Sequence, residues 1–163
     1  MRILVILVAM AGLLGLTSCS KHTTYNGPAV TRLVVLKGER KLFLMHGNKA
    51  IKTYDIELGF APDGDKRFEG DGRTPEGRYF IDRRNPDSSF HLSLGISYPN
   101  QMDRAAAKAA GRSPGGDIFI HGGRRPFDPK QPDWTAGCIS LTNREIEKVY
   151  AMVRTGTPID IYP

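Results

Sequence analysis

The chain has 163 residues, a formal net charge of +6 and two cysteines. This length suffices for a single domain with a hydrophobic core. The basic residues are scattered, with no regularly spaced aromatic residues between them, so the composition gives no case for nucleic-acid binding. The positive charge suits anionic cell-wall polymers or lipid headgroups, or serves only for solubility.

The N-terminus predicts export. After Arg2, residues 3–16 are almost wholly apolar, a run too short for a spanning helix, which needs about 20 residues, but typical of a signal peptide. It ends in Leu-Thr-Ser before Cys19, which resembles the cleavage box of a bacterial lipoprotein. A plain signal peptide or an uncleaved anchor is the alternative. We predict a signal peptide over 1–18, a lipidated Cys19 with a tether over 19–30, and one domain over 31–163.

Lipidation of Cys19 would have two consequences. Ser20, which follows it, favours the outer membrane over the inner one, with the domain facing the periplasm and held by its acyl chains. Cys138 would then have no disulfide partner within the chain in an oxidising compartment. An unpaired thiol there calls for a function.

The domain opens with short strands rich in β-branched and aromatic residues, separated by turn residues. A long loop over 61–75, rich in Gly, Asp and Pro, interrupts them. A second turn is expected over 83–89. The predicted strands are 31–37, 41–45, 50–58, 78–82, 90–97 and 117–120, with a last strand over 158–162.

Two helices are predicted among these strands. The alanine-rich segment 102–110 is typical of a helix and stops at Gly111. A second helix follows Thr142, which forms a capping box with Glu145. Its apolar stripe has helical spacing and consists of Ile146, Val149, Tyr150 and Val153. The predicted class is mainly β with one or two helices, as a β-sandwich or a partly open barrel.

A histidine and a cysteine carry the chemistry that the sequence suggests. The strand over 117–120 ends at His121, and Cys138 follows a Gly/Pro/Arg-rich loop that can bring the two together. A thiol with a pKa near 8.5 is mostly protonated at neutral pH, and an imidazole can take its proton and return it to a leaving amine. Gly137 allows a tight turn, and Thr135 with the amides of Gly137 and Cys138 are candidate oxyanion donors. Alternatively, Cys138 is a small buried hydrophobe or pairs with Cys19.

Three motifs resemble one family. The segments 120–122 and 135–139, together with 71–80 and the run from Phe90 to Asn100, are similar to the L,D-transpeptidase catalytic domain (YkuD-like) over about 31–162. The resemblance implies a β-sandwich-like domain with the histidine and the cysteine on adjacent strands. It also implies a peptidoglycan stem-peptide substrate and neither metal nor organic cofactor.

Carried over to this chain, the resemblance makes Cys138 the nucleophile and His121 the general base and acid, with Gly122 in support. Thr135 stands where the family usually has serine. Ala136 replaces a common histidine, and Ser140 an arginine usual two places after the cysteine. These departures resemble a divergent branch that cuts proteins or peptides from the cell wall. With Ala136 in place, a backbone carbonyl is the candidate partner that orients His121.

Four further residues are candidates for substrate binding. Tyr98 and Trp134 could shape a peptide groove or pack internally. Arg124 could bind a stem-peptide carboxylate, or lie on a solvated loop. His91 could face the cleft or the core. A zinc site formed by His46, His91, His121 and Cys138 is disfavoured, because close ligand pairs are lacking.

Several functions remain open from the sequence. The leading one is acyl transfer through a Cys138 thioester to an amine, which would form a cross-link or attach a lipoprotein to the wall. The alternatives are hydrolysis, as an L,D-carboxypeptidase or an amidase that releases wall-bound proteins, and a silent wall-binding lipoprotein. A papain-like endopeptidase is disfavoured because that class places its cysteine before its histidine. The sequence does not predict the oligomeric state.

Overall fold

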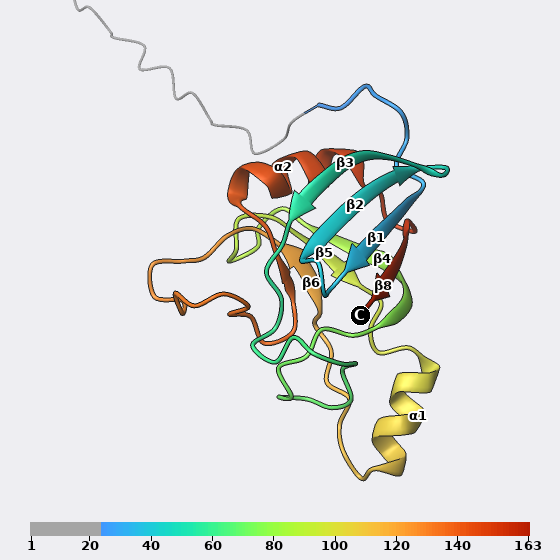
Figure 1. The fold of residues 1–163 in the computed structure, drawn as a ribbon, viewed down its shortest axis with the longest axis vertical. Helices are drawn as coiled ribbons and strands as arrows, with labels where there is room; N and C mark the ends of the chain where they lie inside the picture. Colours follow the sequence, from blue (N-terminus) through green and yellow to red (C-terminus); the bar gives the residue numbers. More distant parts are fainter. Residues whose placement is uncertain (1–23) are drawn as a thin grey trace, which may run out of the picture.

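Eight strands form one continuous sheet in the computed structural model, which describes residues 24–163 (Figure 1). The strand order is β3-β2-β1-β8-β4-β5-β6-β7. The predicted signal peptide and the lipidated Cys19 lie outside the described residues. The strands are β1 (Arg32–Leu36), β2 (Lys41–His46), β3 (Lys49–Asp55), β4 (Gly77–Asn85), β5 (Ser93–Ile96), β6 (Phe119–His121), β7 (Ile139–Ser140) and β8 (Pro158–Tyr162).

The first three strands form the predicted antiparallel meander. Buried and half-buried residues alternate along β1 and β2, and Leu33, Val35 and Leu42 are fully buried. This period of two places one face of each strand on the core. The last strand, β8, pairs in parallel with β1 and antiparallel with β4, so it joins the meander to the second half of the sheet.

The two edges of the sheet meet through the segment that follows β3. Glu57 forms an antiparallel bridge with Ser140 of β7, and Gly59 forms a parallel bridge with Thr135. The sheet therefore curls back on itself, with its core inside the curve. The predicted mainly β class with a partly open barrel is confirmed.

Two helices complete the fold. Helix α2 (Asn143–Met152) begins at Thr142, whose capping box with Glu145 is formed as predicted, and it buries Ile146 and Val149. Helix α1 (Gln101–Ala109) buries only Ala107 and projects beyond the end of the sheet (Figure 1). Over residues 24–163, neither helix is long and apolar enough to cross a bilayer.

Some element boundaries differ from those predicted. The strand expected over 50–58 ends at Asp55, and the chain continues through isolated bridges. The strand expected over 90–97 starts only at Ser93, because His91 adopts a left-handed backbone with φ of 74°. The turn expected over 83–89 is shorter, because β4 stays paired with β5 as far as Asn85. Within the expected tether, Tyr25 and Val30 pack against the core.

A buried lysine fastens the loop over 61–75. Lys37 is only 2% exposed, and its ammonium donates to the carbonyls of Gly64 and Thr74, at 2.6 and 3.0 Å, and to the Glu76 carboxylate at 2.8 Å. Within the loop, the Asp71 carboxylate accepts from the Lys66 ammonium at 2.8 Å. Buried charges are stable when they are paired in this way. The loop is therefore held firmly, although it contains no regular secondary structure.

Replacing Lys37 with methionine should destabilise the domain by about 3 kcal/mol, because it leaves a carboxylate and two carbonyls without their buried donor. The matched control is Lys41→Met, which removes an exposed ion pair with Asp55 and should cost at most about 1 kcal/mol. Urea unfolding of both variants measures the difference. Equal costs would show that Lys37 does not fasten the loop.

Candidate active site

The two candidate catalytic residues lie on neighbouring parallel strands. The register pairs Ile120 with Ile139 and His121 with Ser140, so Cys138, just before β7, lies level with Phe119 of β6. The Phe119 amide donates to the Cys138 sulfur at 3.4 Å. The pairing therefore places the thiol beside the strand that ends in His121, as the resemblance implied.

His121 is fixed in one tautomer. Its ring is only 3% exposed, and Nδ1 lies 2.7 Å from the Gly122 carbonyl oxygen. A carbonyl only accepts, so Nδ1 carries the proton and the neutral ring keeps a lone pair on Nε2. Burial lowers the pKa of His121 below its usual value near 6.5, while the bond to Gly122 partly opposes this shift. At neutral pH the imidazole is therefore an uncharged base, oriented by a backbone carbonyl.

The Gly122 carbonyl is itself held in place. The Gly122 amide donates to the carbonyls of Phe90 at 3.0 Å and Leu92 at 3.2 Å. A Cβ on Gly122 would lie 2.3 Å from the Phe90 oxygen, so only glycine fits. The Ser140 hydroxyl also donates to the Gly122 carbonyl, at 3.3 Å. Ser140 thus contacts the group that orients His121.

Cys138 is half-buried and protonated at rest. Burial raises the pKa of its thiol, and the amide of Phe119 opposes that rise only in part. A thiolate–imidazolium ion pair is therefore disfavoured in the free protein. The thiol donates to the Asp117 carbonyl at 3.5 Å, so the cysteine and the histidine are both uncharged in the free protein.

The turn before Cys138 is built by Thr135. Its hydroxyl accepts from the Gly137 amide at 3.1 Å and donates to the Cys138 carbonyl at 2.7 Å. The Thr135 hydroxyl and the Gly137 amide, two of the three expected oxyanion donors, thus form hydrogen bonds within the turn and support its shape. The third expected donor is the Cys138 amide.

One wall of the site consists of closely packed backbone. Gly137 has a φ of 130°, and a Cβ there would lie 2.6 Å from the Arg73 carbonyl oxygen. A Cβ on Gly59 would lie 2.0 Å from the carbonyl oxygen of Gly72. The loop that Lys37 fastens therefore packs directly against the cysteine turn, with no side chain between them.

Two of the expected substrate-binding residues are occupied elsewhere. Tyr98 is 5% exposed in the core, and its hydroxyl donates to the Pro114 carbonyl at 2.9 Å. It therefore has no surface to offer a peptide. His91 binds Glu147 of α2 at 2.7 Å through Nε2. Core packing therefore holds Tyr98, which is one of the two alternatives that the sequence left open, and an ion pair holds His91. A role of His91 in substrate binding stays a prediction.

The other two, Trp134 and Arg124, both bind Glu57, a residue that the sequence did not indicate. Trp134 is 7% exposed, and its ring meets that of His121 edge-on at a centroid distance of 5.8 Å. The Arg124 guanidinium pairs with the Glu57 carboxylate at 2.5 Å, and the binding of a stem-peptide carboxylate by Arg124 stays a prediction. Phe90, also not singled out, stacks on His121 at 4.4 Å. No local pattern marks Glu57 or Phe90, because both act through contacts distant in sequence.

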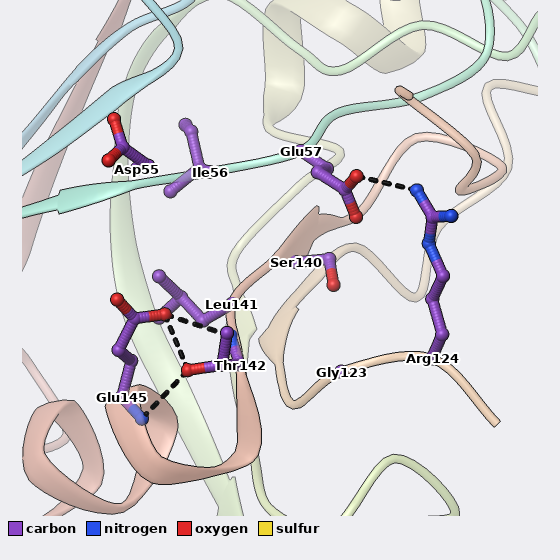
Figure 2. Close-up of a pocket in the computed structure, with 9 residues that line it drawn as sticks. All are labelled: Asp55, Ile56, Glu57, Gly123, Arg124, Ser140, Leu141, Thr142 and Glu145. Atoms are coloured by element: carbon purple, nitrogen blue, oxygen red, sulfur yellow. Dashed lines mark hydrogen bonds and ion pairs between the residues drawn. The ribbon is translucent and has the colours of Figure 1, made fainter. Parts of the chain in front are cut away.

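A pocket of about 530 Å³ lies just beyond the His121 end of the two strands (Figure 2). Gly123, Ser140 and the start of α2 line it. Figure 2 shows Glu57 and Arg124 facing each other at one end, and Thr142 with Glu145 at the other. Neither His121 nor Cys138 lines this pocket, so it adjoins the candidate catalytic pair without containing it.

The fold, with His121 and Cys138 on neighbouring parallel strands, is that of a known class of protein. The L,D-transpeptidase catalytic domain (YkuD) model matches residues 30–161, which is most of the chain. The protein belongs to this family, as the sequence motifs indicated.

Relatives and solved structures agree with this assignment. YafK of Escherichia coli K12, provisionally named an L,D-transpeptidase, is 25% identical over 96% of this chain and 65% of its own length. The chain thus spans about two-thirds of that relative. The helical cell shape determining protein Pgp2 of Campylobacter jejuni superposes with a TM-score of 0.65 at 26% identity, over 84% of this chain and 49% of Pgp2. Bd1075 of Bdellovibrio bacteriovorus gives a TM-score of 0.58 at 28% identity, over 82% of this chain and 48% of its own.

The resting state of the thiol can be measured by alkylation. Because burial raises the pKa of Cys138, its rate of reaction with iodoacetamide should climb steadily with pH to above about 8.5, with no plateau near neutrality. Mass spectrometry of the Cys138 peptide follows the reaction, and Cys138→Ser supplies the blank. A half-maximal alkylation rate below pH 7 would contradict a protonated Cys138 thiol at neutral pH.

The packed backbone makes a second prediction. Gly137→Ala should abolish turnover and cost about 3 kcal/mol of stability, because the added methyl group meets the Arg73 carbonyl and strains the turn. Gly47→Ala is the control, since Gly47 also has a positive φ, of 57°, but open space around it, and should cost about 1 kcal/mol. Thermal unfolding and activity together test this, and an active Gly137→Ala variant would refute it.

Proposed function

We propose that this protein is a cysteine-dependent acyl transferase that acts on peptidoglycan stem peptides by L,D-transpeptidation. The observation that carries the proposal is the single tautomer of His121, whose unprotonated Nε2 belongs to the strand beside Cys138. Family membership over residues 30–161 supports the substrate class. The expected lipid on Cys19 would hold the domain at the outer membrane, facing the periplasm, where this substrate is found.

The catalytic cycle follows from the two neutral groups. The Cys138 thiol gives its proton to Nε2 of His121 as the sulfur attacks a stem-peptide carbonyl carbon. The Cys138 amide, whose hydrogen is not used within the turn by Thr135, is our candidate donor to the oxyanion. The C–N bond then breaks, the imidazolium returns its proton to the departing amine, and a thioester remains. An incoming amine, deprotonated by His121, takes the acyl group and regenerates the thiol.

The incoming nucleophile decides between transfer and hydrolysis. A stem-peptide amine would form a cross-link, and a lipoprotein amine would attach that protein to the wall. Water would make the protein an L,D-carboxypeptidase or an amidase that releases wall-bound proteins. The chemistry up to the thioester is the same in each case, so the products distinguish them.

Incubation with purified muropeptides tests the proposal. The wild type should give new cross-linked dimers by mass spectrometry, and Cys138→Ala and His121→Ala should each lower turnover by at least about 1000-fold. Shortened monomers alone would identify the hydrolytic reaction. Unchanged muropeptides with the wild type, or unchanged turnover with Cys138→Ala, would instead support a silent wall-binding protein.

The same assay has a defined pH dependence. Because burial lowers the pKa of His121, the imidazole stays uncharged at pH 6.5, and kcat/KM should fall only on the acid side of this value as the base becomes protonated. Replacing His121 with alanine should remove this acid limb. An acid limb centred above pH 7 would contradict the buried neutral histidine.

A further inference from the structure

His121 sits in an aromatic enclosure that must itself be held. Phe90 lies against one side of the imidazole, with the two ring planes 30° apart, and Trp134 meets the imidazole edge-on. Phe90 and Trp134 also contact each other, at a centroid distance of 5.7 Å. These two rings restrict rotation of the imidazole, which keeps its bond to the Gly122 carbonyl.

Trp134 comes from the connection between β6 and β7, residues 122–138, which contains no helix or strand. The indole has a single polar group, the Nε1–H, and it donates to Glu57 Oε2 at 2.6 Å. A charge-assisted bond of this length fixes the direction of the indole plane. The orientation of Trp134 against His121 thus depends on the Glu57 carboxylate.

The other oxygen of the same carboxylate fixes the start of this connection. Glu57 Oε1 accepts from Arg124 at 2.5 Å, and Figure 2 shows the two side chains pointing toward each other. The Arg124 guanidinium also donates to the carbonyls of Lys130 and Gln131. One carboxylate therefore binds a side chain near each end of a connection that contains no helix or strand.

Glu57 is mounted on rigid backbone close to the site. Its amide donates to the Ser140 carbonyl at 3.0 Å, and the Ser140 amide donates back at 2.8 Å. Ser140 is the residue paired with His121 across β6 and β7. The carboxylate is thus fixed one strand away from the catalytic pair, and its side chain is 38% exposed.

We propose that Glu57 is a positioning residue: its carboxylate, bound to Trp134 and Arg124, holds the aromatic enclosure that keeps His121 in its reactive orientation. This inference rests on the proposed function, since it assigns His121 as the base. We call Glu57, Arg124 and Trp134 the Glu57 clamp. The clamp acts on catalysis through His121 and does not contact the reacting atoms.

Glu57→Ala and Trp134→Phe test the clamp, with Asp55→Ala as the matched control. Both test variants should lower kcat by about 10- to 100-fold, because a base displaced by about 1 Å loses that much, while KM changes less than about threefold. The kcat of the double variant should equal that of the more impaired single variant, because both changes break the same contact. The control removes a carboxylate two residues earlier, whose partner is Lys41, and should leave kcat unchanged.

The pH profile gives a readout that a general loss of stability would not move. The charged groups acting on His121 are Asp128 and Arg125 of the same connection, and both variants retain them. Opening the enclosure hydrates the ring and raises its pKa, so the acid limb of kcat/KM should shift to higher pH. Simple removal of a negative charge would shift the limb in the opposite direction, which separates the two causes for Glu57→Ala.

The ring nitrogens of His121 can also be observed by 15N NMR on the full chain, independently of turnover. The wild type should show protonated Nδ1 and bare Nε2, and Glu57→Ala and Trp134→Phe should show a mixture of tautomers. Unchanged tautomer and kcat in Glu57→Ala, or losses that multiply in the double variant, would overturn the clamp. If the wild type shows no Cys138-dependent turnover, the proposed function fails, and the NMR arm still decides the clamp.

Both test variants are expected to fold, because other contacts fasten the connection. The Asp133 carboxylate binds Arg40 at 2.8 Å and accepts from the Leu58 amide at 2.9 Å. Thr135 keeps its backbone bridge to Gly59. Thermal unfolding within about 5 °C of the wild type would confirm that the kinetic effects are local.

Discussion

The parallel pairing of β6 with β7 is the constraint on which the site depends. Parallel neighbours cannot be joined by a tight hairpin and need a connection of a dozen or more residues. In most proteins a helix fills that connection and brings its own hydrogen bonds. Here residues 122–138 have no helix, so the order of the connection comes from side chains anchored elsewhere: Glu57, Asp133 through Arg40, and the turn formed by Thr135.

The same burial that organises the site also sets its charge state. For a buried imidazole and a half-buried thiol, the neutral form has a lower free energy than the charged form. The Gly122 carbonyl and the charge of Asp128 oppose this effect of burial on His121 only in part, and the carbonyl is the group that binds the Nδ1 proton. The histidine that we propose as the base is thus an uncharged imidazole of fixed direction at neutral pH.

Much of the fold could be predicted because its signals are local. The capping box of Thr142 with Glu145, the alternation along β1 and β2, and the last strand each depend on a few neighbouring residues. The placement of His121 and Cys138 on neighbouring strands followed from motifs that resemble a known family.

The contacts that the sequence did not indicate have one physical cause. Tyr98, His91 and Arg124 are polar or aromatic residues near the motifs, and their contacts depend on partners distant in sequence, namely Pro114, Glu147 and Glu57. The left-handed backbone at His91 likewise delays to Ser93 the start of a strand that propensity alone would begin earlier. Glu57 carries no local mark, since its environment exists only once the sheet has curled and its edges have met.

The backbone wall formed by Gly59, Gly72 and Gly137 limits how this chain can diversify around its cysteine. Where main chains touch without room for a methyl group, mutation has almost nothing to vary. Differences between homologues near the cysteine then have to come from other segments, and the long connection after His121 carries exposed side chains such as Phe127. Exchanging that connection between homologues, with the glycines left untouched, is thus the exchange that this packing tolerates best.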